Sequence, residues 1–322
     1  MTSAIRTPFT ATLLTCSLLL TACSSGSNPE HFDELTQQGA YSLCLSNDAN
    51  YAFAGSIHNG GSLWRLDPFD RLYDWNHQAD TNSNIVSCDF SPEGNFVATT
   101  DNRTIALWNS ITGEAIWLWN APGDIHDISL TSEGQLALLA MSDYTATLFD
   151  IKNGGIKRIL RHDGIVYDVS LDAKGKLAAS ASDDSSARIW DLNSGKELHR
   201  LKHNNKVRRA QLSPDGRYVF TSALGDPGRV WDTLSGEIIH EFPINSGFYN
   251  SIRFNEDSSL LLTGSSSGKI QLWEVVDARL VKAWQATPKN RWISNNVLIE
   301  DVAFRNDGYV ASASNGRVYY LK

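Results

Sequence analysis

The chain has 322 residues, a net charge of −8, about 42% hydrophobic residues and 20% charged residues. This length suits either two domains or one large all-β domain, and the composition excludes a disordered chain. The acidic balance, without a dense run of lysine and arginine, argues against nucleic acid as the main partner, because phosphate binding needs clustered cations. Four cysteines are too few for a disulfide-dense scaffold and too scattered for a zinc site.

The first 22 residues have the features of a signal peptide rather than of a folded domain. Arg6 precedes a short apolar run at residues 13–20. This run is shorter than the roughly 20 residues that span a bilayer. It ends in Leu20-Thr21-Ala22-Cys23, where small residues precede a cysteine.

That ending resembles the lipobox of bacterial lipoproteins. The resemblance implies cleavage before Cys23, a lipid (palmitate) anchor at Cys23, and a periplasmic location. Ser24, rather than aspartate, follows the cysteine, which by the same resemblance favours the outer membrane. The alternative is an ordinary secretory signal with an incidental cysteine. Residues 23–32 are then expected to form a lipidated tether of at most ~35 Å.

The rest of the chain repeats one unit of about 41 residues. Aromatic residues that end a β-rich run recur at spacings of 41 to 44, and two sets of glycines recur at 40 or 41. These three tracks are Trp64, Trp108, Phe149, Trp190, Trp231 and Trp273; Gly113, Gly154, Gly195 and Gly236; and Gly94, Gly134, Gly175 and Gly216.

Each unit predicts four short strands, most clearly in the fourth unit. Residues 166–171 alternate as a half-buried strand does, and residues 177–182 are small and uncharged. Two further strands are expected at residues 187–191 and 196–201, after turns rich in Asp, Asn, Ser and Gly.

The repeated signatures resemble those of WD repeats. They are Trp190-Asp191, Trp231-Asp232, Ser91-Pro92-Glu93-Gly94 and Ser213-Pro214-Asp215-Gly216. The resemblance covers residues 33–322 and implies an all-β fold, a seven-bladed β-propeller of four-stranded WD-type blades.

The seventh unit ends after its third strand. By the same resemblance, an N-terminal strand at residues 33–39 is expected to pair with residues 316–322 and close the last blade. This pairing would remove two open sheet edges.

In WD repeats a histidine, a serine, an aspartate and the tryptophan form a structural tetrad of hydrogen bonds. In the fourth unit the matching residues are His162, Ser180, Asp184 and Trp190. A Ser–His–Asp row also occurs in nucleophilic triads, but a row that ends on a tryptophan within a blade favours a structural role. We expect this full set in the fourth unit alone, because the second, fifth and sixth units have Asn102, Gly225 and Ser267 at the aspartate position.

Cys44 and Cys88 lie in the first strands of adjacent units, and they point to opposite faces of their own blades. Adjacent blades meet with opposite faces, so a disulfide is possible if the Cα atoms come within about 7 Å. Two buried free thiols are the alternative.

Residues at the start of each first strand are expected to ring one mouth of the central channel. A long loop at residues 285–298 adds a tryptophan and an arginine to this rim, and such residues dominate interface hot spots. The alternative is that these side chains are merely solvated or pair with each other. The predicted partner-binding residues are His126, Asp127, Tyr167, Asp168, Arg208, Arg209, Phe248, Tyr249, Arg291, Trp292, Glu300 and Asp301.

Common catalytic and phosphate-binding motifs are missing from the sequence, and no metal site or cofactor is expected. The sequence predicts a non-catalytic, monomeric scaffold that binds other proteins of the cell envelope, in its assembly or maintenance. One alternative is a small-ligand or glycan-binding propeller that uses Trp292. The other is a propeller hydrolase or lyase with its site at the channel mouth.

Overall fold

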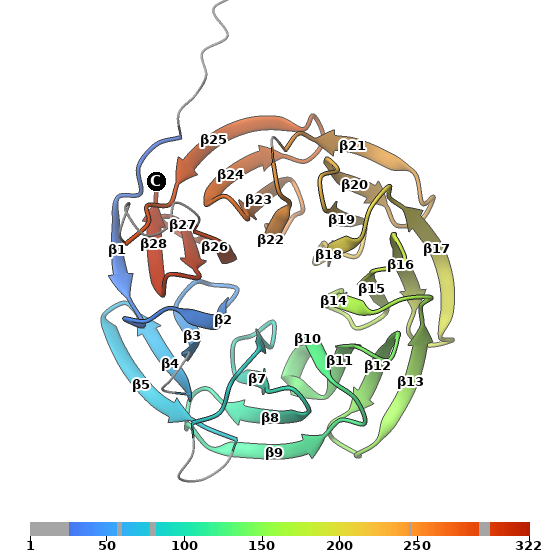
Figure 1. The fold of residues 1–322 in the computed structure, drawn as a ribbon, viewed down its shortest axis with the longest axis horizontal. Coiled ribbons are helices and arrows are strands. Elements are labelled where there is room, and N and C mark those ends of the chain that lie inside the picture. The colour runs from blue at the N-terminus through green and yellow to red at the C-terminus, as the bar shows by residue number, and fades with distance from the viewer. Residues whose placement is uncertain (1–25, 57–59, 78–81, 245, 290–296) are drawn as a thin grey trace, which may run out of the picture.

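Each unit of the repeat folds into an antiparallel four-stranded sheet, and the seven sheets form a ring (Figure 1). The computed structural model describes residues 26–56, 60–77, 82–244, 246–289 and 297–322. The fold is therefore an all-β seven-bladed propeller, as the repeat predicted. Within the described residues the helical content is one 3-10 turn, Ser132–Gly134.

The first strand of each blade lines the channel and the fourth forms the outer edge (Figure 1). Blade 1 comprises β2 (Ala40–Leu45), β3 (Tyr51–Ser56), β4 (Gly60–Leu66) and β5 (Phe69–Trp75). Blade 2 comprises β6 (Ser87–Phe90), β7 (Phe96–Thr100), β8 (Thr104–Asn109) and β9 (Ala115–Asn120). Blade 3 comprises β10 (Ile125–Leu130), β11 (Leu136–Met141), β12 (Thr145–Asp150) and β13 (Ile156–Arg161).

Blades 4 to 6 repeat this order without interruption. Blade 4 comprises β14 (Val166–Leu171), β15 (Leu177–Ser182), β16 (Ser186–Asp191) and β17 (Lys196–Lys202). Blade 5 comprises β18 (Val207–Leu212), β19 (Tyr218–Ala223), β20 (Gly228–Asp232) and β21 (Ile238–Phe242). Blade 6 comprises β22 (Tyr249–Phe254), β23 (Leu260–Ser265), β24 (Lys269–Glu274) and β25 (Arg279–Gln285).

Blade 7 is closed by the N-terminal part of the chain. Its strands are β26 (Ile299–Arg305), β27 (Gly308–Ala313), β28 (Arg317–Leu321) and β1 (His31–Glu34), and β1 pairs antiparallel with β28. The closing strand thus lies earlier than the expected residues 33–39. After Glu34 the chain turns inward, because it must reach β2 beside the channel, and buried Leu35 packs between blades 7 and 1.

The blades are held together by apolar clusters that lie between neighbours. One cluster joins Leu138 and Leu148 of blade 3 to Val169 and Trp190 of blade 4. Small residues in the second strands, such as Ala178, allow the sheets to approach closely. A single blade cannot bury both of its faces, so stacking in a ring supplies the core.

The outer strands make a second set of contacts with the turn of the next blade. In blade 1 the Tyr73 hydroxyl donates to the Ile111 carbonyl at 2.6 Å, and in blade 4 His199 Nε2 lies 3.0 Å from the Leu234 carbonyl oxygen. Arg158 and His240 contact the carbonyls of Asn193 and Val276 in the same way.

These outer contacts account for Gly113 and Gly236, two glycines of one track. Gly113 has a φ of +78°, and a side chain there would meet the Tyr73 ring at 2.5 Å. Gly236 has a φ of +72° and is placed in the same way beneath His199. Glycine is needed at both turns because the left-handed conformation and the close contact coincide.

Candidate functional site

The axis of the ring contains a cavity of about 790 Å³. Its lining comes from the first strands of all seven blades, β2, β6, β10, β14, β18, β22 and β26. The lining is rich in charged side chains, among them Asp89, Asp127, Asp168, Arg209, Arg253, Glu300 and Asp301.

At each junction between blades, a side chain of one first strand bonds the next blade. Asp168 of blade 4 accepts the Ala210 N–H of blade 5 at 2.7 Å, and Asp127 of blade 3 accepts the Val169 N–H of blade 4 at 3.1 Å. At three other junctions a side chain donates to a backbone carbonyl: Ser42 to Ile85, Arg209 to Asn250, and Asn250 to Ile299. At the last two a carboxylate accepts a backbone N–H: Asp89 from Leu130, and Asp301 from Leu45. We call this set the inner bonds.

The inner bonds place ionisable groups in a poorly solvated space. Asp168 is 7% exposed and accepts a bond from Arg209 Nη1 at 2.6 Å. Burial raises the pKa of Asp127 to about 8, and the neighbouring Asp168 adds to this shift while Arg209 opposes it. Burial likewise raises the pKa of Asp89 and of Glu300 to about 7.

Three predicted partner-binding residues come together at one mouth of the channel. The Tyr167 ring lies 5.3 Å from the His126 ring, and the Arg208 guanidinium carbon lies 4.0 Å from the centre of the Tyr167 ring. His126 is exposed, and Tyr167 and Arg208 are half-buried. These residues begin β10, β14 and β18, so the stack extends over blades 3 to 5. An arginine over an aromatic ring is held in place before any partner binds.

Other predicted partner-binding residues have a structural role. Tyr249 is wrong as a surface residue: it is fully buried, its ring contacts Phe220 edge-on at 5.5 Å, and its hydroxyl donates to the Pro243 carbonyl. Asp127, Asp168, Arg209 and Asp301 take part in the inner bonds, and Asp168 is too deeply buried to meet a protein partner.

Two of the remaining predicted partner-binding residues lie within the described residues. Glu300 lies 3.5 Å from Asn250 Nδ2, and Phe248 is half-buried before β22. Arg291, Trp292 and the predicted lipidation residue Cys23 lie outside the described residues.

The tetrad residues of blade 4 form one hydrogen-bonded row. His162 Nδ1 lies 3.1 Å from Asp184, its Nε2 lies 2.7 Å from Ser180 Oγ, and Trp190 Nε1–H donates to the same oxygen at 2.8 Å. Burial lowers the pKa of His162, and Asp184 opposes that shift. Ser180 is 0% exposed, so its hydroxyl, which already accepts the Trp190 N–H, is closed to a substrate.

Blade 5 has part of such a row. His203 Nε2 lies 2.8 Å from Thr221 Oγ1, to which Trp231 donates at 2.7 Å. His203 Nδ1 accepts from Arg229 at 3.2 Å and lies 3.6 Å from Asp226, which is beyond hydrogen-bond distance. Asp226 lies one residue after Gly225, which is the position that aligns with Asp184 of blade 4.

Blade 2 also has part of such a row, with an acid one residue earlier than expected. His77 and Trp108 both contact Thr99 Oγ1 at 2.8 Å. His77 Nδ1 lies 3.6 Å from Asp101 and makes no hydrogen bond to it. Threonine in place of serine, and an acid shifted along the turn, are the signals that the sequence reading missed.

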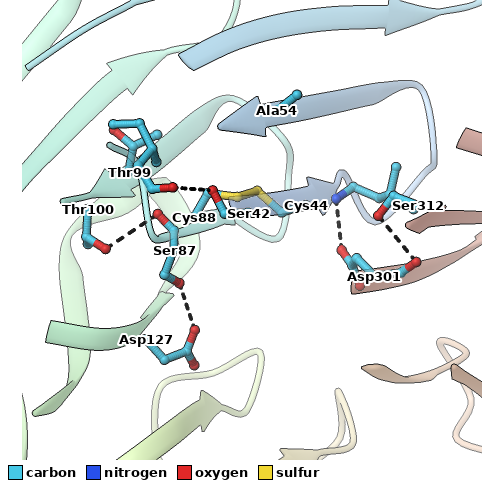
Figure 2. The surroundings of a disulfide bond; sticks show 12 residues. Ser42, Cys44, Ala54, Ser87, Cys88, Thr99, Thr100, Asp127, Asp301 and Ser312 are labelled. Carbon is cyan, nitrogen blue, oxygen red and sulfur yellow. Dashed lines mark hydrogen bonds between the residues drawn. A yellow bond between two sulfur atoms is a disulfide. The ribbon is translucent and has the colours of Figure 1, made fainter. Parts of the chain in front are cut away.

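Cys44 and Cys88 form a disulfide between blades 1 and 2, with their Cα atoms 6.1 Å apart (Figure 2). The bond joins β2 to β6, beside Ser87, whose hydroxyl donates to Asp127 at 2.8 Å (Figure 2). Cys44 occupies the position that Asp89 has in blade 2, so a covalent link replaces the carboxylate at this junction.

Comparison with protein families supports the nature of the repeat. The family model described as WD domain, G-beta repeat, matches residues 72–109, 155–191 and 236–274. Each matched segment runs from the outer strand of one blade to the third strand of the next. The chain therefore contains WD40 repeats in at least three places within a seven-bladed propeller. A search of curated proteins finds no match for the chain.

Within the described ranges, no three or more His, Cys, Asp and Glu side chains are grouped so as to hold a metal ion. Those ranges also contain no helix with the length and apolar character needed to cross a membrane.

Proposed function

We propose that this chain is a non-catalytic protein-interaction scaffold, held by a lipid on Cys23 at the periplasmic face of a bacterial outer membrane. Its task would be to hold other envelope proteins in place during assembly or maintenance of the envelope. The observation that carries the binding role is the stack of exposed His126 with half-buried Tyr167 and Arg208 across three blades. WD40 propellers commonly bind proteins, and the lipobox resemblance of residues 20–23 supports the anchor.

Affinity purification from membranes tests the binding surface. Tyr167→Ala and Arg208→Ala should each lose a partner that the unchanged protein retains. Arg217→Ala is the matched control, because Arg217 also stacks on a tyrosine, Tyr218, at 4.7 Å, but at the opposite end of β18. Identical partners for all three variants would overturn the proposed surface.

Membrane fractionation tests the anchor separately. Cys23→Ser should abolish labelling of the protein with radioactive palmitate and remove it from the outer-membrane fraction, because the proposed lipid attachment point is then missing. Palmitate labelling and outer-membrane recovery that match those of the unchanged protein would show that the anchor is wrong.

A second candidate is binding of a small ligand in the channel. The cavity of about 790 Å³ is within the usual size range of ligand sites, and Asp89 and Glu300 in its wall have raised pKa values. A thermal-shift screen of sugars and cationic amino-acid esters, repeated with Glu300→Gln, would identify such a ligand. A hydrolase or lyase has less support, because Asp127 and Asp168 are each bonded to a neighbouring backbone N–H.

A further inference from the structure

The first described residues of the chain are fixed to the outer edge of blade 6 (Figure 1). The Ser27 N–H donates to the Ala283 carbonyl at 2.8 Å, and the Ser27 carbonyl accepts the Gln285 N–H at 3.2 Å. A side chain on Gly26 would meet the carbonyl carbon of Trp284 at 2.9 Å, so the Gly26 backbone rests directly on β25.

The chain remains bound between this point and β1. The Glu30 N–H donates to the Tyr320 carbonyl at 2.8 Å, and the Glu30 carboxylate pairs with Lys322 at 3.1 Å. The expected ten-residue tether is therefore part of the ring from Gly26 onward. Three residues, 23–25, are left outside the ring, and the proposed lipid is attached to the first of them, Cys23.

Three residues span at most ~11 Å, so an acyl group on Cys23 must enter the lipid close to Gly26. The bridge between Ser27 and Trp284 is parallel. Followed backward from Ser27 to Gly26, the chain thus runs along β25 from Trp284 toward Lys282. The anchor leaves the ring at its outer edge rather than at either mouth of the channel.

The outer surface of β25 has side chains that suit a lipid headgroup layer. Leu280 and Val281 are 36% and 45% exposed, and Arg279 and Lys282 beside them are also exposed. β25 itself has no carboxylate, but Glu274 of β24 pairs with Arg279, so Lys282 supplies the positive charge beside the apolar side chains. Such a combination binds the boundary region of membranes that contain anionic lipids.

We propose that the outer edge of blade 6, formed by Arg279, Leu280, Val281 and Lys282, is the surface that lies on the membrane. This inference rests on the proposed lipid anchor. The ring then stands on its edge, and both mouths of the channel stay open to the periplasm. The outer strands across the ring, β9 and β13, point away from the lipid (Figure 1). The stack of His126, Tyr167 and Arg208 lies on blades 3 to 5 and stays accessible to a partner.

Quenching by spin-labelled lipid tests this orientation. The lipidated protein is made with one introduced cysteine, labelled with bimane, and bound to vesicles of phosphatidylethanolamine and phosphatidylglycerol that contain a doxyl-labelled phospholipid. Val281→Cys reports on the proposed surface. Ile159→Cys on β13 is the matched control, since Ile159 is 46% exposed and Val281 is 45% exposed. Leu234→Cys and Tyr144→Cys report on the two faces of the ring.

The expected result is quenching at position 281 at least roughly threefold greater than at position 159, and greater than at positions 234 and 144. Equal quenching at 281 and 159 in protein that floats with the vesicles would overturn the orientation and leave the anchor intact. Strongest quenching at 234 or 144 would instead show that a face of the ring lies on the lipid. Protein that fails to float would overturn the anchor and the orientation together. A label at 281 that is shielded in cells but not quenched in vesicles would show that a protein covers this edge, against the proposal.

Discussion

Blades 4 and 5 are joined both beside the channel and at the outer edge, and the two contacts differ in chemistry. Beside the channel, Asp168 is 7% exposed and holds both the Ala210 N–H and the Arg209 guanidinium. At the outer edge, the half-buried His199 meets the carbonyl of Leu234, which is 89% exposed. Water can readily replace the outer bond, whereas the carboxylate of Asp168 is largely shielded from solvent. Interactions near the axis should therefore dominate the stability of the ring.

The largest effect should follow from Asp168→Ala. The change leaves the half-buried Arg209 guanidinium and the buried Ala210 N–H without this acceptor, which should lower the free energy of unfolding by about 3–5 kcal/mol. Denaturant unfolding measures this loss. Asp163→Ala is the control, because Asp163 also pairs with an arginine, Arg188, but its side chain is 73% exposed. It should cost less than about 1 kcal/mol. Similar losses in the two variants would contradict the difference between buried and exposed contacts.

The Cys44–Cys88 disulfide joins the first strands of blades 1 and 2, and its removal should have the next largest effect on stability. Cys44 and Cys88 are 44 residues apart, so the bond restricts a long segment of the unfolded chain. Replacing both with alanine should lower the free energy of unfolding by about 2–4 kcal/mol. Reducing the unchanged protein should give a similar loss. If neither treatment changes the unfolding midpoint, the inner contacts of blades 1 and 2 do not depend on this bond.

The buried carboxyl groups should make the ring less stable as the pH rises from 6.5 to 8.5. The pKa of Asp127 is raised to about 8 and those of Asp89 and Glu300 to about 7, so in this range the folded chain binds more protons than the unfolded chain. Stability from these groups is therefore lost as the pH rises, by roughly 1 kcal/mol per pH unit for one fully protonated group.

The histidines of the tetrads have the opposite effect, but only at lower pH. Burial lowers the pKa of His162, and lowers that of His203 to about 4, so these residues bind fewer protons in the folded state below about pH 6.5. Unfolded histidine, with a pKa near 6.5, is mostly neutral above about pH 7.5. Unfolding measured at pH 7.5 and 8.5 should therefore isolate the carboxyl groups, and Asp127→Asn should reduce the decline. A protein that becomes more stable over this range would contradict the assignment.

The smallest effect is expected at the outer edge. Tyr73→Phe removes the hydroxyl that donates to the Ile111 carbonyl but keeps the ring against Gly113. Because the bond is exposed, the free energy of unfolding should fall by less than about 1 kcal/mol. A loss above about 2 kcal/mol would mean that the outer contacts stabilise the ring as strongly as the inner ones.

The candidate site was only partly predictable from the sequence. The repeat register assigned His126, Tyr167 and Arg208 to the start of successive first strands, but their stacking depends on the angle between blades. The same register treated Tyr249 as a surface residue, although its ring completes the core between blades 5 and 6. Asp226 and Asp101 were missed because the turns of blades 5 and 2 place the acid one residue later or earlier than in blade 4.

The amino-acid sequence by itself determined the number of blades and the strands within them, since strand alternation, turn glycines and the 41-residue period are local and recur along the chain. Only the tertiary structure decided which polar side chains meet. The Cys44–Cys88 bond, the inner carboxylates and the contact of Ser27 with β25 all join different blades. Whether such groups bond depends on the ångström-scale position of one sheet against the next, which packing of the whole ring sets.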